Sequence, residues 1–559
     1  MRLGLALILA LALALRLPAA RYGLPHFVHP DESLLVPLAV QFLTGDLNPH
    51  FFNWPSAYMY TLAGLYAVVG ALSPSDGALS SVAVFVRDPA PFYLLGRMVS
   101  TLLGVTTVLL TYMLGARLVG PAVGLAASLF LAMNLQHVVD SHFATADVPV
   151  TCAVLAALLA TLRYWERGRR SDALLAGLLG GLAASVKYNG GLVGAAFLTA
   201  HLLRVRSFEG WGGSVLRGWA PLVWFAGAVV GFVAGTPFAA LAPREFARGL
   251  FGEIHAIGTV QFGNEADPSG LLFHLLHSLP QAMGIPLLLA AAGGLVLALR
   301  RHTPLDLIVL AFPLPYFAII GTWDSRFERY AEPLFPFASV LAAVGLAGLA
   351  SWWPSRRALG LAILAALAVL PVAVRVLYYE ALLARPDSRE VAAAWLDRNL
   401  PAGASVAMEP YSPPVTWRDE TGLVHRITSP PADGSGVARG IQRYRPEVRQ
   451  ATGPRVLPLT LYDLEALRAR GVGYVVLSSF MFKRHLESCE QFPAPCRFYQ
   501  ALDRSATLVY AVRPVPEDQR LWVGDIYAPV SHVFSRTQPG PIIKVYRLAG
   551  DGPASAGTR

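Results

Sequence analysis

Two neighbouring carboxylates, Asp31 and Glu32, follow the first long apolar run in the segment HPDE (29–32). Asp31 could accept a proton from a hydroxyl group as a general base. It could also cap the helix predicted for SLLVPLAVQFL, because Asp is a favoured N-cap and an acidic residue suits the first helical turn. A solvated pair without a role is the third interpretation. For this segment alone, capping is the simplest.

A third carboxylate, Asp147, stands with Pro149 at the start of another apolar run, in DSHFATADVP (140–149), which also contains His142. Proline in the first turn of a helix is ordinary, and aspartate before it is a good cap. Capping is therefore the simpler interpretation here too. Both segments nevertheless place a carboxylate at the same predicted membrane face.

Lysine is rare in this chain, which has 42 arginines and only three lysines. Lys187 is the single lysine of the apolar part and stands at the end of an apolar run in SVKYNGG. It could extend its ammonium group to the membrane interface, as many such lysines do. It could equally contact a lipid phosphate.

Arginines also occur on the predicted outer side, in DSRFERYAEPLFPF (324–337), where Arg326, Arg329 and Tyr330 precede an apolar run. Positive charge outside runs against the usual bias. The arginines could pair with acidic neighbours in the same segment. They could instead hold an anionic headgroup.

The elements that must position these side chains are membrane helices. Hydrophobic residues make up 54% of the 559 residues and charged residues only 14%. That balance excludes an ordinary soluble domain. The net charge of +9 comes without a basic stripe and interleaved aromatics, so nucleic acid is not an expected partner. We predict about eleven spans, at 3–20, 97–117, 120–139, 147–164, 172–187, 189–204, 218–240, 276–299, 304–321, 331–350 and 358–378.

Arginine placement predicts the orientation. Arginines gather in alternate loops, at 163–170, at 204, 206 and 217, at 300–301 and at 356–357. A cytoplasmic N-terminus places all of these inside, and an odd number of spans then places the C-terminus outside. The first outer loop, 21–96, contains the apolar stretch 53–72, which we interpret as an interfacial helix rather than a further span.

A change of composition near residue 380 divides the chain into a membrane module, 1–379, and a domain, 380–559. DSREVAAAWLDRNLPAG and LYDLEALRARG are typical of helices, and ASVAME, GYVVLSS, ATLVYAVRP and IIKVYRL of strands. Together they predict an extracytoplasmic α/β domain. Cys489 and Cys496 can close a disulfide loop in an oxidising compartment, whereas a zinc site would need more ligands than His485.

Two carboxylate sites and two cationic sites on one face suit a reaction between a lipid-phosphate donor and a hydroxyl acceptor. A carboxylate can take the hydroxyl proton, and cations can stabilise the departing phosphate. A transporter or flippase of lipid-linked sugars is one alternative, although its sites should lie near the midplane. A non-catalytic envelope-assembly protein is another, in which Asp31 and Asp147 act only as helix caps.

HPDE, FNWPSAYMY, HFATADVP and RYAEPLFP, in this order, resemble the GT-C superfamily of polyprenyl-phosphate-dependent glycosyltransferases. The likeness is to the branch of the protein O-mannosyltransferases and the lipid A aminoarabinose transferase, and it covers most of the chain. It implies inverting transfer of one sugar from a polyprenyl phosphate carrier to a hydroxyl acceptor. The expected setting is the extracytoplasmic face of the cell membrane, without a metal or another cofactor.

The resemblance also implies roles for individual residues. Asp31 would be the catalytic base, with Glu32 and Asp147 as further catalytic residues. The donor phosphate would be bound by Lys187, Arg326, Arg329 and Tyr330. The remaining candidates for substrate contact are His29, His142, Asn53 and Trp54.

Overall fold

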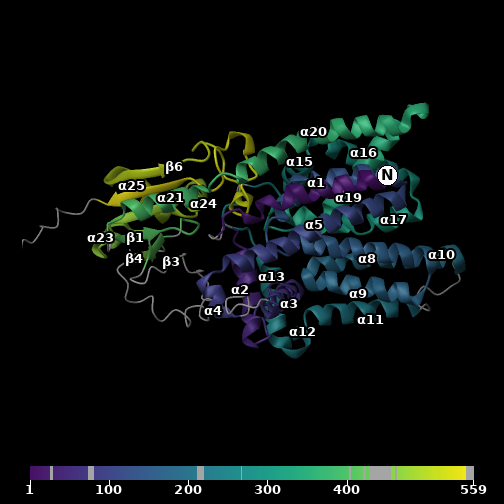
Figure 1. Cartoon of the computed structure of the whole chain (residues 1–559), viewed down its shortest axis with the longest axis horizontal. Helices are drawn as coiled ribbons and strands as arrows, with labels where there is room; N and C mark the ends of the chain where they lie inside the picture. Colours follow the sequence, from purple (N-terminus) through teal and green to yellow (C-terminus); the bar gives the residue numbers. More distant parts are fainter. Residues whose placement is uncertain are drawn as a thin grey trace, which may run out of the picture. The chain divides into compact units, whose positions relative to one another are not determined.

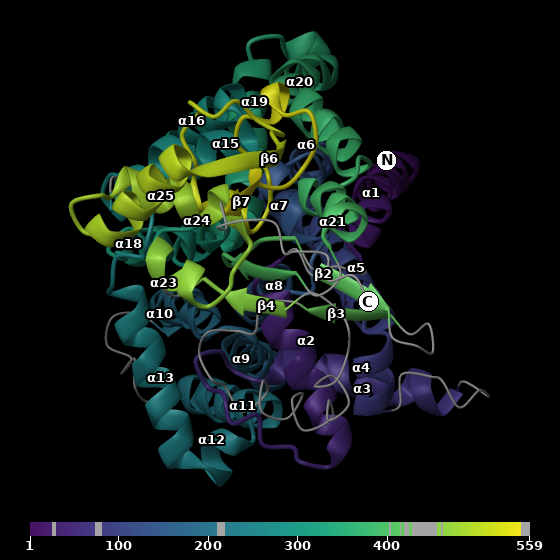
Figure 2. The same cartoon turned by 90° about the vertical axis from the view of Figure 1, so that its left-hand side faces the viewer.

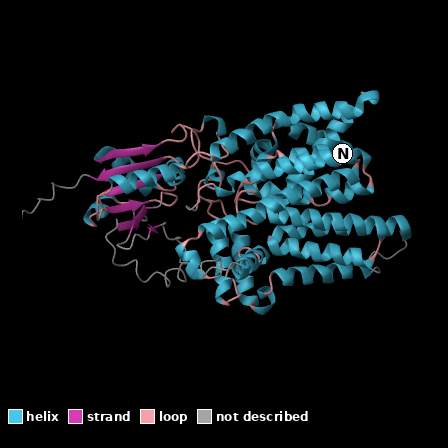
Figure 3. Cartoon of the chain, in the orientation of Figure 1, coloured by secondary structure: helices cyan, strands magenta, loops and turns pink. Residues whose placement is uncertain are grey.

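The computed structural model describes residues 1–24, 29–72, 81–209, 219–265, 267–401, 404–413, 415–418, 424–427, 455–459 and 462–548. The chain divides into two compact units. The first comprises Met1–Arg21, Asp31–Gln261 and Asp267–Glu380, and the second Tyr22–Pro30, Phe262–Ala266 and Ala381–Arg559. Figure 3 shows helices in both units, whereas the described strands belong to the second.

Helices make up the first unit because its sequence consists mainly of apolar runs punctuated by Gly, Pro and short polar loops. They are α1 (Arg2–Arg16), α2 (Glu32–Gln41), α3 (Ala57–Leu72), α4 (Val82–Arg87), α5 (Ala90–Leu118), α6 (Pro121–Ala132), α7 (Leu135–Asp140), α8 (Asp147–Arg167), α9 (Arg170–Val186), α10 (Gly194–Glu209), α11 (Trp219–Gly235), α12 (Phe238–Leu241), α13 (Pro243–Ile257), α14 (Gly270–Phe273), α15 (Leu279–Met283), α16 (Ile285–Arg301), α17 (Pro304–Leu310), α18 (Pro313–Ile320), α19 (Phe335–Ala350) and α20 (Arg357–Leu383). A 3₁₀ helix, η5 (Glu328–Leu334), leads into α19.

Every apolar run predicted to span contains helix, but not every helix is long. Among the described residues, five helices are long and apolar enough to cross a membrane. A sixth results if Gly270–Met283 and Ile285–Arg301, which meet at 115°, form one span. Other runs are interrupted, as between α6 and α7, where the Asn134 side chain caps α7 by accepting a hydrogen bond from the His137 amide. The count of eleven and the orientation stay predictions.

Helices α8, α9 and α11 lie side by side in Figure 1. Glycines allow the backbones of α9 and α11 to approach closely. A Cβ atom added at Gly177 would lie 2.1 Å from the Trp224 carbonyl oxygen, and one at Gly181 would lie 1.9 Å from that of Ala228. Small residues at such contacts are typical of membrane helix packing, where van der Waals contact replaces the hydrophobic effect as the driving force.

The second unit is built on a five-stranded sheet with the order β4-β1-β5-β7-β6. Its strands are β4 (Arg455–Pro458), β1 (Ser405–Met408), β5 (Tyr474–Ser478), β7 (Ile543–Leu548) and β6 (Ala506–Val512). β1 pairs in parallel with β4 and β5, and β7 pairs antiparallel with β5 and β6. All four predicted strands are confirmed. Sequence patterns missed β4 and the hairpin β2 (Val415–Arg418) with β3 (Val424–Ile427).

Alternate side chains of the sheet enter two separate cores. Val406 and Met408 pack with Leu396 of α21 (Ser388–Asn399), whereas Ala407 between them faces the opposite core. That second core is formed with α23 (Leu464–Ala469), α24 (Ser479–Glu487) and α25 (Pro493–Ser505). Figure 2 shows these helices and the sheet from the end of the unit. A disulfide joins Cys489, which follows α24, to Cys496 in α25.

Candidate functional site

Asp31 forms an ion pair with a distant arginine. It occupies the residue before α2, yet in the described part of the chain its carboxylate makes no capping hydrogen bond to that helix. Its Oδ2 atom lies 3.4 Å from Nη2 of Arg329, and its side chain is 12% exposed. The capping interpretation of Asp31 is therefore wrong. The Asp31 carboxylate pairs with Arg329, nearly 300 positions away in sequence, instead of accepting a hydrogen bond from a backbone amide of α2.

Asp147 is likewise engaged by a distant cation. The cap position of α8 belongs to Ala146, and Asp147 is the first helical residue. Its Oδ1 accepts a hydrogen bond of 2.6 Å from Nζ of Lys187, which directly follows α9. Capping is wrong here as well, because this carboxylate joins two neighbouring helices through an ion pair.

The two ion pairs share an aromatic ring. Nζ of Lys187 lies 5.2 Å from the centre of the Tyr330 ring, and the Arg329 guanidinium lies 5.7 Å from it. Arg329 also lies 4.3 Å from the Phe327 ring, and both arrangements are favourable cation–π contacts. The structure thus brings two carboxylates, two cations and a tyrosine into one cluster, although they come from η5 and the ends of α2, α8 and α9.

Burial and the neighbouring charges determine the protonation of Asp31. Burial is the largest influence and raises the pKa of this carboxyl above its ordinary value of 3.8. The Arg329 and Lys187 charges lower the pKa, while Asp147 raises it. A carboxylate with a raised pKa is a better proton acceptor than an exposed one, provided that it stays ionised.

Glu253 on α13 is a member of this environment that sequence patterns missed. The Asn53 side chain and the charges of Lys187, Arg329 and Asp31 all act on its carboxyl group. Burial is the largest influence and raises the pKa of its carboxyl. In the sequence, Glu253 is one of two glutamates on an amphipathic stretch and belongs to no motif. Asn53 thereby adjoins the cluster.

The Glu32 side chain pairs with Arg97 in the protein interior and not with a residue of the cluster. Its two carboxylate oxygens accept hydrogen bonds from Nε and Nη2 of Arg97, at 2.8 and 2.7 Å. One of them also accepts a bond of 2.7 Å from the backbone amide of Ala144. Both charged side chains are fully buried. This geometry fits a residue that fixes the chain beside Asp31, and a catalytic role of Glu32 stays a prediction.

Arg326 and Trp54 contact other residues than those of the cluster. Arg326 lies 3.7 Å from Asp324 and donates a hydrogen bond of 3.1 Å to the Asp267 carbonyl oxygen. Trp54 packs edge-on against Phe51. Of the two arginines predicted to bind phosphate, only Arg329 is held against Asp31 by a described ion pair.

The two candidate histidines are both buried. Nε2 of His142 donates a hydrogen bond of 3.1 Å to the Leu15 carbonyl oxygen, and the imidazole stacks on Tyr379. His29 belongs to the second unit, where it packs edge-on against Tyr527. The substrate-contact roles of His29 and His142 stay predictions. Within the described residues, no group of three or more His, Cys, Asp and Glu side chains is placed to hold a metal ion.

Part of the chain matches a known protein family. The family model described as dolichyl-phosphate-mannose-protein mannosyltransferase matches residues 94–234. A comparison with curated protein sequences finds no match. The matched region runs from α5 to α11 and contains Asp147 and Lys187, whereas Asp31 and Arg329 lie outside it.

Solved structures resemble the chain over nearly its whole length. ArnT from Cupriavidus metallidurans, solved bound to undecaprenyl phosphate, is 15% identical and has a TM-score of 0.52, with 99% of each chain covered. The Archaeoglobus fulgidus oligosaccharyltransferase tethered with an acceptor peptide is 12% identical with a TM-score of 0.52, covering 98% of this chain and 88% of that one. The chain therefore has the same fold as these two proteins, in agreement with the predicted resemblance to the GT-C superfamily.

Proposed function

We propose that the protein is an inverting glycosyltransferase that moves one sugar from a polyprenyl phosphate to a hydroxyl group of an extracytoplasmic acceptor. The observation that carries this proposal is the joint cluster of the Asp31–Arg329 and Asp147–Lys187 ion pairs. Such a cluster supplies a proton acceptor and anion-binding cations within one small volume. The GT-C fold supports the choice of a lipid-phosphate donor.

In the proposed reaction, the acceptor oxygen attacks the anomeric carbon of the donor sugar. A bond forms between that oxygen and the carbon while the bond from the carbon to the phosphate oxygen breaks. Asp31 takes the proton of the acceptor hydroxyl. The bond electrons leave with the polyprenyl phosphate, and attack from the opposite side inverts the configuration. No general acid is needed, because phosphate is a good leaving group.

Lys187 and Arg329 bind the phosphate in this proposal. The leaving phosphate gains one negative charge as its bond to the sugar breaks, so nearby cations stabilise the transition state more than the ground state. Each cation is now paired with a carboxylate. Donor phosphate would compete with Asp31 for Arg329, and this competition would release Asp31 to act as the base.

The decisive experiment incubates purified protein with a panel of polyprenyl-phosphate sugars and an extract of envelope acceptors, and it measures release of polyprenyl phosphate. Wild type should release it with one of the donors, and Asp31→Asn should lower the rate by about a hundredfold or more. Asp46→Asn is the matched control, because Asp46 lies in the same unit and is half-exposed. Retained activity in Asp31→Asn, with thermal unfolding unchanged, would overturn the assignment.

A further inference from the structure

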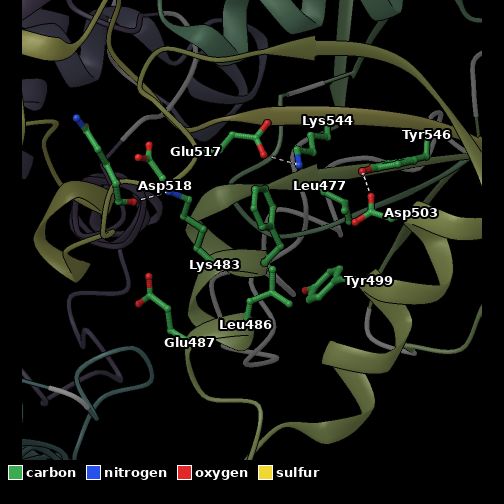
Figure 4. A pocket seen from close by; sticks show the side chains of 12 residues that line it. Leu477, Lys483, Leu486, Glu487, Tyr499, Asp503, Glu517, Asp518, Lys544 and Tyr546 are labelled. Carbon is green, nitrogen blue, oxygen red and sulfur yellow. Dashed lines mark hydrogen bonds and ion pairs between the residues drawn. The ribbon is translucent and has the colours of Figure 1, made fainter.

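A cavity of about 370 Å³ opens into the second unit, and no residue of the candidate functional site lines it. Its walls come from α24, α25, β5 and β7 and from the segment 517–519. Figure 4 shows the side chains that line it. The volume lies near the lower end of the range of about 300–1,000 Å³ that is usual for small-molecule sites.

Two of the chain's three lysines line this one cavity, although arginine outnumbers lysine by 42 to three. Nζ of Lys483 donates a hydrogen bond of 2.6 Å to the Gln519 carbonyl oxygen. Nζ of Lys544 lies 3.0 Å from Oε2 of Glu517, as drawn in Figure 4. An ammonium group has three donors on a flexible stem, so each lysine can keep its protein partner and still offer a donor to a ligand.

Carboxylates outnumber these lysines in the lining. Glu487, Asp503, Glu517 and Asp518 all line the cavity. Arg513 lies 2.6 Å from Glu517 and adds one cation beside the cavity, so that four carboxylates stand against three cations and an acidic ligand is disfavoured. A ligand with hydroxyl or amino groups would find acceptors in the carboxylates and donors in the lysines.

Aromatic and aliphatic side chains complete the walls. Phe482, Tyr499 and Tyr546 line the cavity with Leu477 and Leu486. Tyr546 is anchored by a hydrogen bond from its hydroxyl to Asp503, shown as a dashed line in Figure 4. A rigid aromatic ring flanked by polar groups matches a molecule that has an apolar face and a polar edge.

From this combination we infer that the cavity binds one sugar unit that lacks acidic groups. The C–H face of a pyranose suits the aromatic and leucine side chains, and its hydroxyl or amino groups suit the carboxylates and lysines. The inference deepens the proposed function and rests on it in one respect, namely that the bound sugar belongs to a glycan acceptor. Binding itself requires no turnover and stands apart from Asp31.

Saturation-transfer NMR on the full-length protein tests the inference, in a detergent without a sugar headgroup. Three trisaccharides serve as probes: neutral cellotriose, amine-bearing tri-glucosamine and acidic trigalacturonate. We expect transfer to the first two and none to the third. Asp518→Ala removes one acceptor, and Leu486→Trp fills the cavity from a position that is 44% exposed and therefore tolerant of substitution. Each should weaken binding by about tenfold.

Glu490→Ala is the matched control, because Glu490 is an exposed carboxylate of the same unit that does not line the cavity. It should bind as wild type does. Absence of transfer to cellotriose and tri-glucosamine, equal transfer to trigalacturonate, or unchanged binding in Leu486→Trp would overturn the inference. Polyprenyl phosphate release is measured separately from trisaccharide binding. Failure of the proposed glycosyl transfer can therefore be distinguished from failure of sugar binding in the cavity.

Discussion

Nζ of Lys187 lies 2.6 Å from Oδ1 of Asp147, although the two residues are 40 positions apart and stand at the ends of different helices. The pair lies mostly out of solvent. Two buried charges persist in a membrane protein only when they compensate one another or serve a ligand. Their position beside Arg329, Asp31 and the Tyr330 ring argues that they bind a ligand as well as compensate each other's charge.

Lys187→Met should lower both stability and donor affinity. Loss of the ammonium group leaves Asp147 buried without its partner, at a cost of about 3–5 kcal/mol. Double substitution with Asp147→Asn removes the unpaired charge and should restore the midpoint of thermal unfolding. Donor affinity should stay about tenfold or more below wild type in the double variant. Recovery of affinity together with stability would mean that Lys187 is purely structural.

Arg329 and Arg326 form a natural matched pair of substitutions. Arg329→Gln should weaken binding of the polyprenyl-phosphate sugar by about tenfold or more, because it removes a cation beside the phosphate. Arg326→Gln should have a smaller effect, because Arg326 is held by Asp324 and the Asp267 carbonyl oxygen. Equal losses in the two variants would contradict this placement.

The pH dependence of the reaction should report on Asp31. Burial raises the pKa of this carboxyl and Arg329 lowers it, so kcat/KM should rise with pH along an acidic limb above the ordinary value of 3.8. In Arg329→Gln the lowering influence is lost, and the limb should move to higher pH. Arg326→Gln should leave the limb where it is. A limb that Arg329→Gln does not move would place the base elsewhere.

Removal of Arg97 should destabilise the first unit severely. Arg97→Met leaves Glu32 as an unpaired buried carboxylate, which costs about 3–5 kcal/mol. Arg97→Met combined with Glu32→Leu should recover most of that loss. The exposed pair of Arg468 with Glu465 provides the control, since Arg468→Met should change stability by less than about 1 kcal/mol. The measurement is thermal unfolding in detergent.

Stability of the second unit should fall between pH 6.5 and 8. Burial raises the pKa of Glu409 from 4.5 to about 8, so the folded chain keeps a proton there that the unfolded chain releases. Burial lowers the pKa of His485 from 6.5 to about 4, an influence that opposes Glu409 only below pH 6.5. Above that value His485 no longer opposes Glu409, whose own contribution is at most about 1.4 kcal/mol per pH unit.

Hydrogen exchange at the Ser478 amide, which donates to Glu409 at 2.8 Å, measures this effect in the intact chain. In wild type its protection should decrease as pH rises through this window, after correction for intrinsic exchange. Glu409→Gln keeps an acceptor and cannot titrate, so protection should become flat. A wild-type profile that is already flat would show that Glu409 is ionised in the fold.

The sequence by itself determined the features that depend on local pattern. Apolar runs predicted the helical segments, and alternating runs predicted β1, β5, β6 and β7, because helix and strand periodicity is written in neighbouring residues. The single lysine of the apolar part and the carboxylate of HPDE stood out by type and position alone. Local reasoning also misled, since it assigned Asp31 and Asp147 to caps that neither forms.

Only the tertiary structure decided which charges meet. Arg97 reaches Glu32 across 65 positions, Lys187 reaches Asp147 across 40, and Glu253 joins from a helix without any motif. Lys483 and Lys544 likewise line one cavity from α24 and β7. Such partners are chosen by the packing of helices and strands far apart in sequence. Coulomb energy grows as two charges approach and as their surroundings become less polar, so the role of a charged residue depends on which partners the fold brings close to it.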